Sequence, residues 1–94
     1  MAKHKLKAWD SAEYLKTEED VINYLEAVFE DGDPALIAHA LGVVARAKGM
    51  ARIARKTGLG RESLYKALSR DGNPRLLTVL KVVHALGLKL KVAA

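Results

Sequence analysis

The sequence predicts a mainly α-helical domain that contains a helix-turn-helix, and three observations predict it. Apolar residues recur at intervals of three and four over most of the chain, which is the period of an amphipathic helix. Gly58 interrupts this pattern, and glycine readily adopts the positive φ angle that ends a helix. The stretches on either side, residues 50–57 and 61–69, have the lengths of the two short helices of a helix-turn-helix.

Length and charge narrow the classes of function. A chain of 94 residues fits one domain, and a hydrophobic content of 50% excludes a disordered tail. The net charge is +5, but nine of the 11 acids lie in residues 1–33, and twelve of the 16 lysines and arginines lie in residues 34–94. A basic region attracts phosphate, because binding releases condensed counterions. The distribution therefore favours a nucleic-acid partner, with a merely solvated basic surface as the alternative.

Several classes of protein are not expected. The sequence has no cysteine, which excludes disulfides and thiolate metal sites and suits the cytoplasm, the location that we expect. No apolar run has the length of a signal peptide or a membrane span. The histidines, His4, His39 and His84, lack the spacing of metal ligands, and no catalytic constellation is visible. We therefore expect no enzyme, no metal and no cofactor.

The first long helix is expected to begin after Thr17 and to stop at Gly32. The Thr17 hydroxyl can cap exposed amides, and the acids of residues 18–20 lie at the positive end of the helix dipole. We interpret residues 1–33 as an N-terminal extension that carries this acidic helix. The apolar group around Trp9 indicates either a short turn packed on the core or a docking segment for a partner protein.

The remaining helices are expected within a second part, residues 34–94. Asp33 can cap the first of them, with Pro34 in its first turn, where a missing N–H costs no hydrogen bond. Asn73 is the expected cap of the last helix, which Pro74 opens. That helix is apolar over most of its circumference and must be covered on two sides. Its apolar residues are Leu76, Leu77, Val79, Leu80, Val82, Val83 and Leu86.

The C-terminal residues alternate between apolar side chains and lysines, which is the pattern of a β-strand. They are Leu88, Lys89, Leu90, Lys91 and Val92. A single strand in a helical chain has no partner within its own sequence, and its open edge can pair with the same strand of a second copy. We therefore predict a homodimer that is joined at least partly by antiparallel pairing of these five residues.

The second helix of the predicted helix-turn-helix has one polar side, which would enter the major groove of DNA. The candidates for base contacts on this side are Arg61, Glu62, Tyr65, Lys66 and Ser69. Other polar residues nearby in sequence would hold the DNA backbone and fix the register without reading bases. These are Arg52, Arg55, Lys56, Asn73 and Arg75. For each of these residues the alternative is a solvated side chain.

Several runs of residues resemble a known family over nearly the whole chain after residue 8. The specific part is the run Glu62-Ser63-Leu64-Tyr65-Lys66-Ala67-Leu68 followed by Gly72-Asn73-Pro74. The residues before it, Gly58-Leu59-Gly60-Arg61, and Asp31-Gly32-Asp33-Pro34 further upstream also match. The chain resembles lambda-repressor-like helix-turn-helix domains of the xenobiotic-response-element type, and among these the addiction-module antidote proteins. Gly60 departs from the family, which more often has a serine cap there.

The resemblance implies a five-helix lambda-repressor-like domain with an N-terminal helical extension and a short C-terminal strand. It also implies a dimeric DNA-binding antitoxin that neutralises a toxin of the RelE/ParE superfamily and represses its own operon. The alternative is a protein-interaction module whose helix-turn-helix does not bind DNA. In both cases the acids of helix 17–31, such as Glu18, Glu19 and Glu26, contact a basic partner or are simply solvated.

Overall fold

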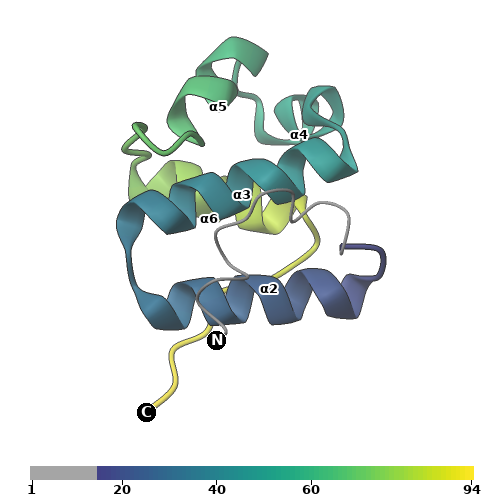
Figure 1. Cartoon of the computed structure of the whole chain (residues 1–94). Helices are drawn as coiled ribbons and strands as arrows, with labels where there is room; N and C mark the ends of the chain where they lie inside the picture. Colours follow the sequence, from purple (N-terminus) through teal and green to yellow (C-terminus); the bar gives the residue numbers. More distant parts are fainter. Residues whose placement is uncertain (1–14) are drawn as a thin grey trace.

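Helical periodicity and end caps produce five helices within residues 15–94, the part of the chain that the computed structural model describes (Figure 1). They are α2 (Glu18–Asp31), α3 (Pro34–Lys48), α4 (Met50–Thr57), α5 (Arg61–Ala67) and α6 (Leu76–Ala85). The predicted mainly helical fold is confirmed. The family resemblance implied a five-helix domain in addition to a helical N-terminal extension. One of the five observed helices, α2, belongs to that extension, so residues 34–94 contain four. Trp9 and Tyr14, in the predicted apolar group, lie outside the described residues.

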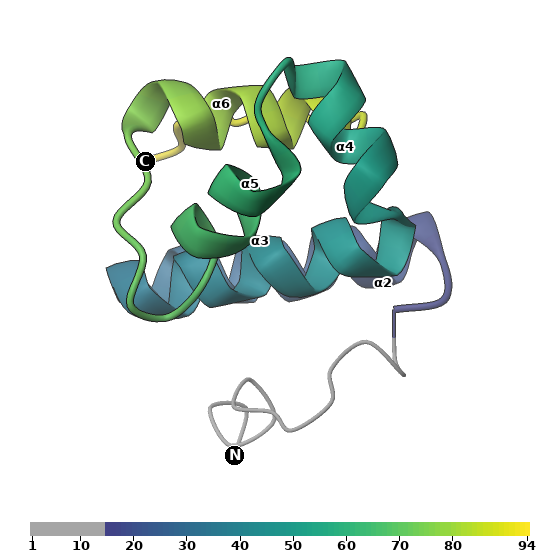
Figure 2. The ribbon, with the colours of Figure 1, turned by 90° about the horizontal axis from the view of Figure 1, so that it is seen from above.

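The helices form three layers. In Figure 1, α3 and α6 lie in the middle, α2 packs below them, and α4 and α5 lie above. The view from above shows α5 between α3 and α6, with α4 beside it (Figure 2). Side chains from all five helices meet in one core. Its buried residues are Val21, Leu25, Val28, Ala40, Leu41, Val44, Ala45, Met50, Ile53, Leu64, Leu68, Val82, Val83 and Leu86.

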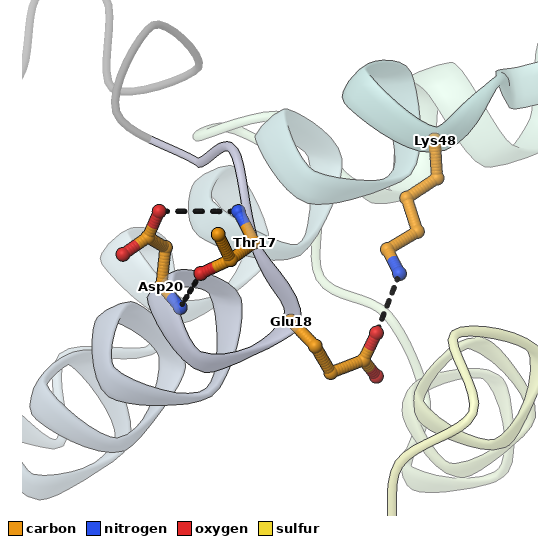
Figure 3. A network of polar contacts seen from close by, with 4 residues as sticks. All are labelled: Thr17, Glu18, Asp20 and Lys48. Carbon is orange, nitrogen blue, oxygen red and sulfur yellow. Dashed lines mark hydrogen bonds and ion pairs between the residues drawn. The ribbon is translucent and has the colours of Figure 1, made fainter.

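A reciprocal cap starts α2, as the sequence predicts (Figure 3). The Thr17 hydroxyl accepts a hydrogen bond from the Asp20 amide at 3.0 Å, and the Asp20 carboxylate accepts one from the Thr17 amide at 3.1 Å. Glu18 turns away from this cap and pairs with Lys48 at 3.5 Å. This contact links the start of α2 to the end of α3. The helix ends at Gly32, whose φ angle is 81°.

The helix α3 also begins as predicted and then approaches α5 very closely. The Asp33 carboxylate accepts a hydrogen bond from the Ala35 amide at 3.0 Å, and Pro34 is the first helical residue. Near the middle of α3, a Cβ atom at Gly42 would lie 2.3 Å from the backbone oxygen of Leu68. Only a hydrogen atom fits there. Gly42 therefore sets the distance between α3 and the end of α5.

The helix α6 begins two residues later than predicted, so Asn73 is not its cap and Pro74 does not open it. Arg75 has the extended backbone of the N-cap, and no side chain caps the helix. The reason lies in the preceding turn. The Gly72 amide donates to the Ser69 carbonyl at 2.9 Å, and a Cβ at Gly72 would lie 2.2 Å from the Ala67 carbonyl oxygen. The turn is therefore held against α5, and the chain must extend before α6 can start.

The predicted β-strand at residues 88–92 is wrong, because residues 86–94 form no strand. The Leu88 amide instead donates to the Val83 carbonyl at 3.1 Å and helps to end α6. A strand needs a second strand to share its hydrogen bonds, and residues 15–94 supply none. The tail therefore leaves the core, with Leu90 40% and Val92 fully exposed. None of the helices described in residues 15–94 has the length and apolar character needed to span a membrane.

The close approach at Gly42 predicts a stability effect. Alanine at this position should lower the free energy of unfolding by about 1–2 kcal/mol, because overpacking against backbone outweighs the gain in helix propensity. Urea unfolding measures the difference. The matched control is Ala47→Gly at an exposed position of the same helix, which measures the helix-propensity difference between glycine and alanine without the clash, up to about 1 kcal/mol. Equal stability of Gly42→Ala and the natural protein would contradict the interpretation of this contact.

Candidate nucleic-acid interface

The bend between α4 and α5 is built from glycine and threonine. Gly58 has a φ angle of 75°, and its amide donates to the Ala54 carbonyl at 2.9 Å, which ends α4. The buried Thr57 hydroxyl donates to the same carbonyl at 3.1 Å and accepts from the Leu59 amide at 3.2 Å. Gly60 is extended at the N-cap of α5. The predicted glycine bend is therefore confirmed. The sequence analysis missed the two hydrogen bonds by which the Thr57 side chain stabilises this bend.

The helix α5 turns its apolar side inward and leaves its polar side open. Leu64, and Leu68 just past the helix end, are each only 1% exposed, so they anchor α5 in the core. The opposite side carries exposed residues that the sequence analysis singled out. These are Arg61, Glu62, Tyr65 and Lys66. We call them the outer face of α5, and it lies in the layer that α5 forms with α4 (Figure 1).

Two side chains of the outer face contact each other. The Arg61 guanidinium lies over the Tyr65 ring, with its Cζ atom 5.9 Å from the ring centroid. This arrangement is favourable because a cation is attracted to the face of an aromatic ring. The ring therefore restricts the directions in which Arg61 can reach. Within residues 15–94 the ion pair joins Lys48 and Glu18, and Arg61 is paired with no acid there.

The structure separates Ser69 from the other predicted base-contact residues. The helix is seven residues long and ends at Ala67, so Ser69 lies beyond it instead of on its polar side. Its side chain is half-buried, and its hydroxyl donates to the Lys66 carbonyl at 2.9 Å. This hydrogen bond satisfies one of the free carbonyls at the end of α5. The Ser69 hydroxyl proton thus has a structural role.

The predicted backbone-contact residues fall into two groups on the surface. Arg52, Arg55 and Lys56 are exposed on α4, ahead of the bend. Asn73 and Arg75 are exposed in the segment between α5 and α6. These two groups therefore stand before and after α5 along the chain. Together with the outer face, these exposed residues include six cations and one acid, Glu62, a balance that would attract an anionic polymer.

Sequence reasoning overlooked a third group of basic residues beside α5. His39 and Arg46 lie on α3, and Arg70 follows α5. The pKa of His39 is lowered by burial first, and further by the positive charges of Arg70 and Arg46. Arg70 lies 31 positions after His39 and 24 after Arg46. The sequence therefore showed only that His39 and Arg46 are seven residues apart within one expected helix. The structure brings them together.

Comparison with known proteins gives a match over nearly the whole chain. Residues 5–94 match the family model described as "Probable addiction module antidote protein". An uncharacterized protein of Haemophilus influenzae is 48% identical over 88 residues, which are 94% of this chain and 91% of that protein. No solved structure gives a significant match. The family match covers every helix described here and the interface around α5, and the chain therefore belongs to the family of probable addiction module antidote proteins.

Proposed function

We propose that this protein is the antitoxin of a type II toxin–antitoxin module. It neutralises a RelE/ParE-like toxin in the cytoplasm and represses its own operon through sequence-specific DNA binding. Membership of the antidote family supports the first activity. The open polar face of α5, anchored from behind by two buried leucines, is the single observation that carries the second. Neither activity requires a catalytic step, a metal or a cofactor.

In this proposal α4 and α5 are a helix-turn-helix of the lambda-repressor-like type, and α5 enters the major groove. Arg61 contacts a guanine or a phosphate, in a direction restricted by Tyr65. Glu62 accepts from a cytosine amino group, and Lys66 reads a guanine or binds a phosphate. Tyr65 contacts a thymine methyl group or a phosphate. Ser69 can only accept a hydrogen bond there while its hydroxyl donates to the Lys66 carbonyl.

The cations on either side of α5 would hold the duplex. Arg52, Arg55 and Lys56 are exposed and bind phosphates ahead of the bend, and Arg75 with Asn73 binds them after α5. Such contacts fix the position of the protein on the duplex and carry no sequence information directly. They account for affinity, whereas the outer face of α5 accounts for preference between sequences.

We also propose that the antitoxin acts as a homodimer. A dimer would bind two half-sites about 34 Å apart, or a multiple of that distance, on a near-palindromic operator. The tail at residues 88–92 is a candidate contact, because Leu90 and Val92 expose apolar side chains that a second copy would bury.

The toxin-binding surface is proposed on α2. This helix lies on the opposite side of α3 and α6 from α5 (Figure 1), so toxin and operator can bind together. Two acids of its first turn have other contacts: Glu18 pairs with Lys48, and Asp20 caps the helix. Glu19 and Glu26 are exposed and are left to attract a basic toxin.

The assignment of α5 predicts a loss of preference in Arg61→Ala. Binding to the DNA upstream of the operon should weaken by about 1–3 kcal/mol, and binding to random DNA should weaken less. Fluorescence anisotropy with both duplexes at several salt concentrations measures this difference. The control, Arg52→Ala, should weaken both duplexes alike and reduce the salt dependence. Unaltered preference in Arg61→Ala would refute the assignment, and weak binding to any sequence by the natural protein would favour the protein-interaction module.

The assignment of α2 predicts that Glu19→Gln/Glu26→Gln impairs co-purification of the toxin encoded next to the antitoxin. The impairment should be largest at low salt, because ions screen the attraction between surface charges at high salt. Quantitative pull-down with the tagged toxin measures it. Glu62→Gln, on the far side of the molecule, is the control. Undiminished complex formation by the double variant would remove the electrostatic role of α2.

The dimer proposal predicts that removal of residues 88–94 shifts the protein towards monomer, since the exposed apolar tail would no longer be shared between copies. Sedimentation velocity over a range of concentrations measures the shift. An unchanged sedimentation coefficient would show that the tail has no part in self-association.

A further inference from the structure

A set of basic side chains gathers where the end of α5 packs on α3. His39, Gly42 and Arg46 are spaced by three and four residues, so they share one face of α3. The Leu68 carbonyl rests on Gly42 in the middle of this row. The Arg46 Nη1 atom would lie 3.4 Å from a Cβ at Gly42, so its long side chain folds back towards the same contact.

The same contact also brings Arg70 to this place. Arg70 follows Leu68 by two residues, and the Leu68 backbone cannot move away from Gly42 without opening the core. The electrostatic environment of His39 shows the result, because both Arg70 and Arg46 lower its pKa. Arg46 and Arg70 are exposed. In the described part of the chain, no acid is recorded in an ion pair with either arginine.

We propose that His39, Arg46 and Arg70 form a binding site for one backbone phosphate of DNA, at the end of α5. The two arginines repel each other, since no acid within residues 15–94 forms an ion pair with them, and a phosphodiester would replace this repulsion by charge-assisted hydrogen bonds. The site stands apart from Arg52, Arg55 and Lys56, which precede the start of α5. The duplex is therefore held at both ends of the helix that reads it.

The inference rests on the proposed DNA binding and adds a site to it. A different account of the same cations is that they only offset the negative end of the α5 dipole. In that case their removal would affect folding stability and leave the salt dependence of DNA binding unchanged. The two accounts therefore differ in a measurable quantity.

The test compares Arg46→Gln/Arg70→Gln with a control of equal charge, Lys16→Gln/Lys81→Gln. All four side chains are exposed, so both variants are expected to fold, and thermal unfolding verifies this. Lys16 precedes α2, and Lys81 lies on α6, and neither belongs to a group of residues assigned to DNA or to the dimer contact. In Arg46→Gln/Arg70→Gln the slope of log K against log salt should fall by about 0.9 for each protomer bound, equally for operator and random DNA. Equal slopes in the two variants would overturn the site.

A second measurement identifies the source of the phosphate. The His39 imidazole resonances should shift when a short duplex is added, and this shift should be absent in Arg46→Gln/Arg70→Gln. Inorganic phosphate is titrated separately at matched ionic strength. A response to inorganic phosphate without a response to the duplex would overturn the assignment to the DNA backbone.

The phosphate site and the proposed function fail in different ways. If the natural protein shows no preference for its operator but the double variant lowers the salt slope, the phosphate site stands and operator repression falls. If preference for the operator is intact and the salt slope is unchanged in the double variant, only the phosphate site falls. If the natural protein binds no DNA at all, both the phosphate site and operator repression are wrong.

Discussion

The contact between Gly42 of α3 and the backbone of Leu68 at the end of α5 is the constraint on which the rest of the structure depends. A helix of seven residues has little stability of its own and must be held by packing. Leu64 and Leu68 supply that packing, and the missing side chain at Gly42 lets them reach full burial. The direction of the polar side of α5, and therefore the proposed binding to DNA, follows from this contact.

Charge is divided between two sides of the molecule. The helix α2, which carries exposed acids, lies below α3 and α6, and the helices α4 and α5, which carry exposed cations, lie above them (Figure 1). A compact core of apolar side chains separates the two surfaces. An antitoxin has to contact a protein and, in the proposed function, an operator. Under the proposed function, this division would let the acidic side contact the toxin and the basic side contact DNA without competition for the same surface.

Most helix ends and the inward-facing residues of α2 to α5 could be predicted from the sequence, because caps and helical periodicity are local. Thr17 and Asp33 cap their helices as expected, and Gly58 ends α4. The exposed side of α5 followed from the spacing of Leu64, Ala67 and Leu68. The candidate site was therefore predictable to the extent that it lies on one regular helix.

The family resemblance and the helical composition were thus determined by the sequence itself, whereas three features were decided only by tertiary structure. The start of α6 depends on how Gly72 folds back on α5, and the alternation at residues 88–92 cannot make a strand without a second strand. The grouping of His39, Arg46 and Arg70 depends on a contact between residues 26 positions apart, Gly42 and Leu68. Periodicity describes which side of a helix is apolar, but the distance between two helices is set by the atoms that meet when the core is closed.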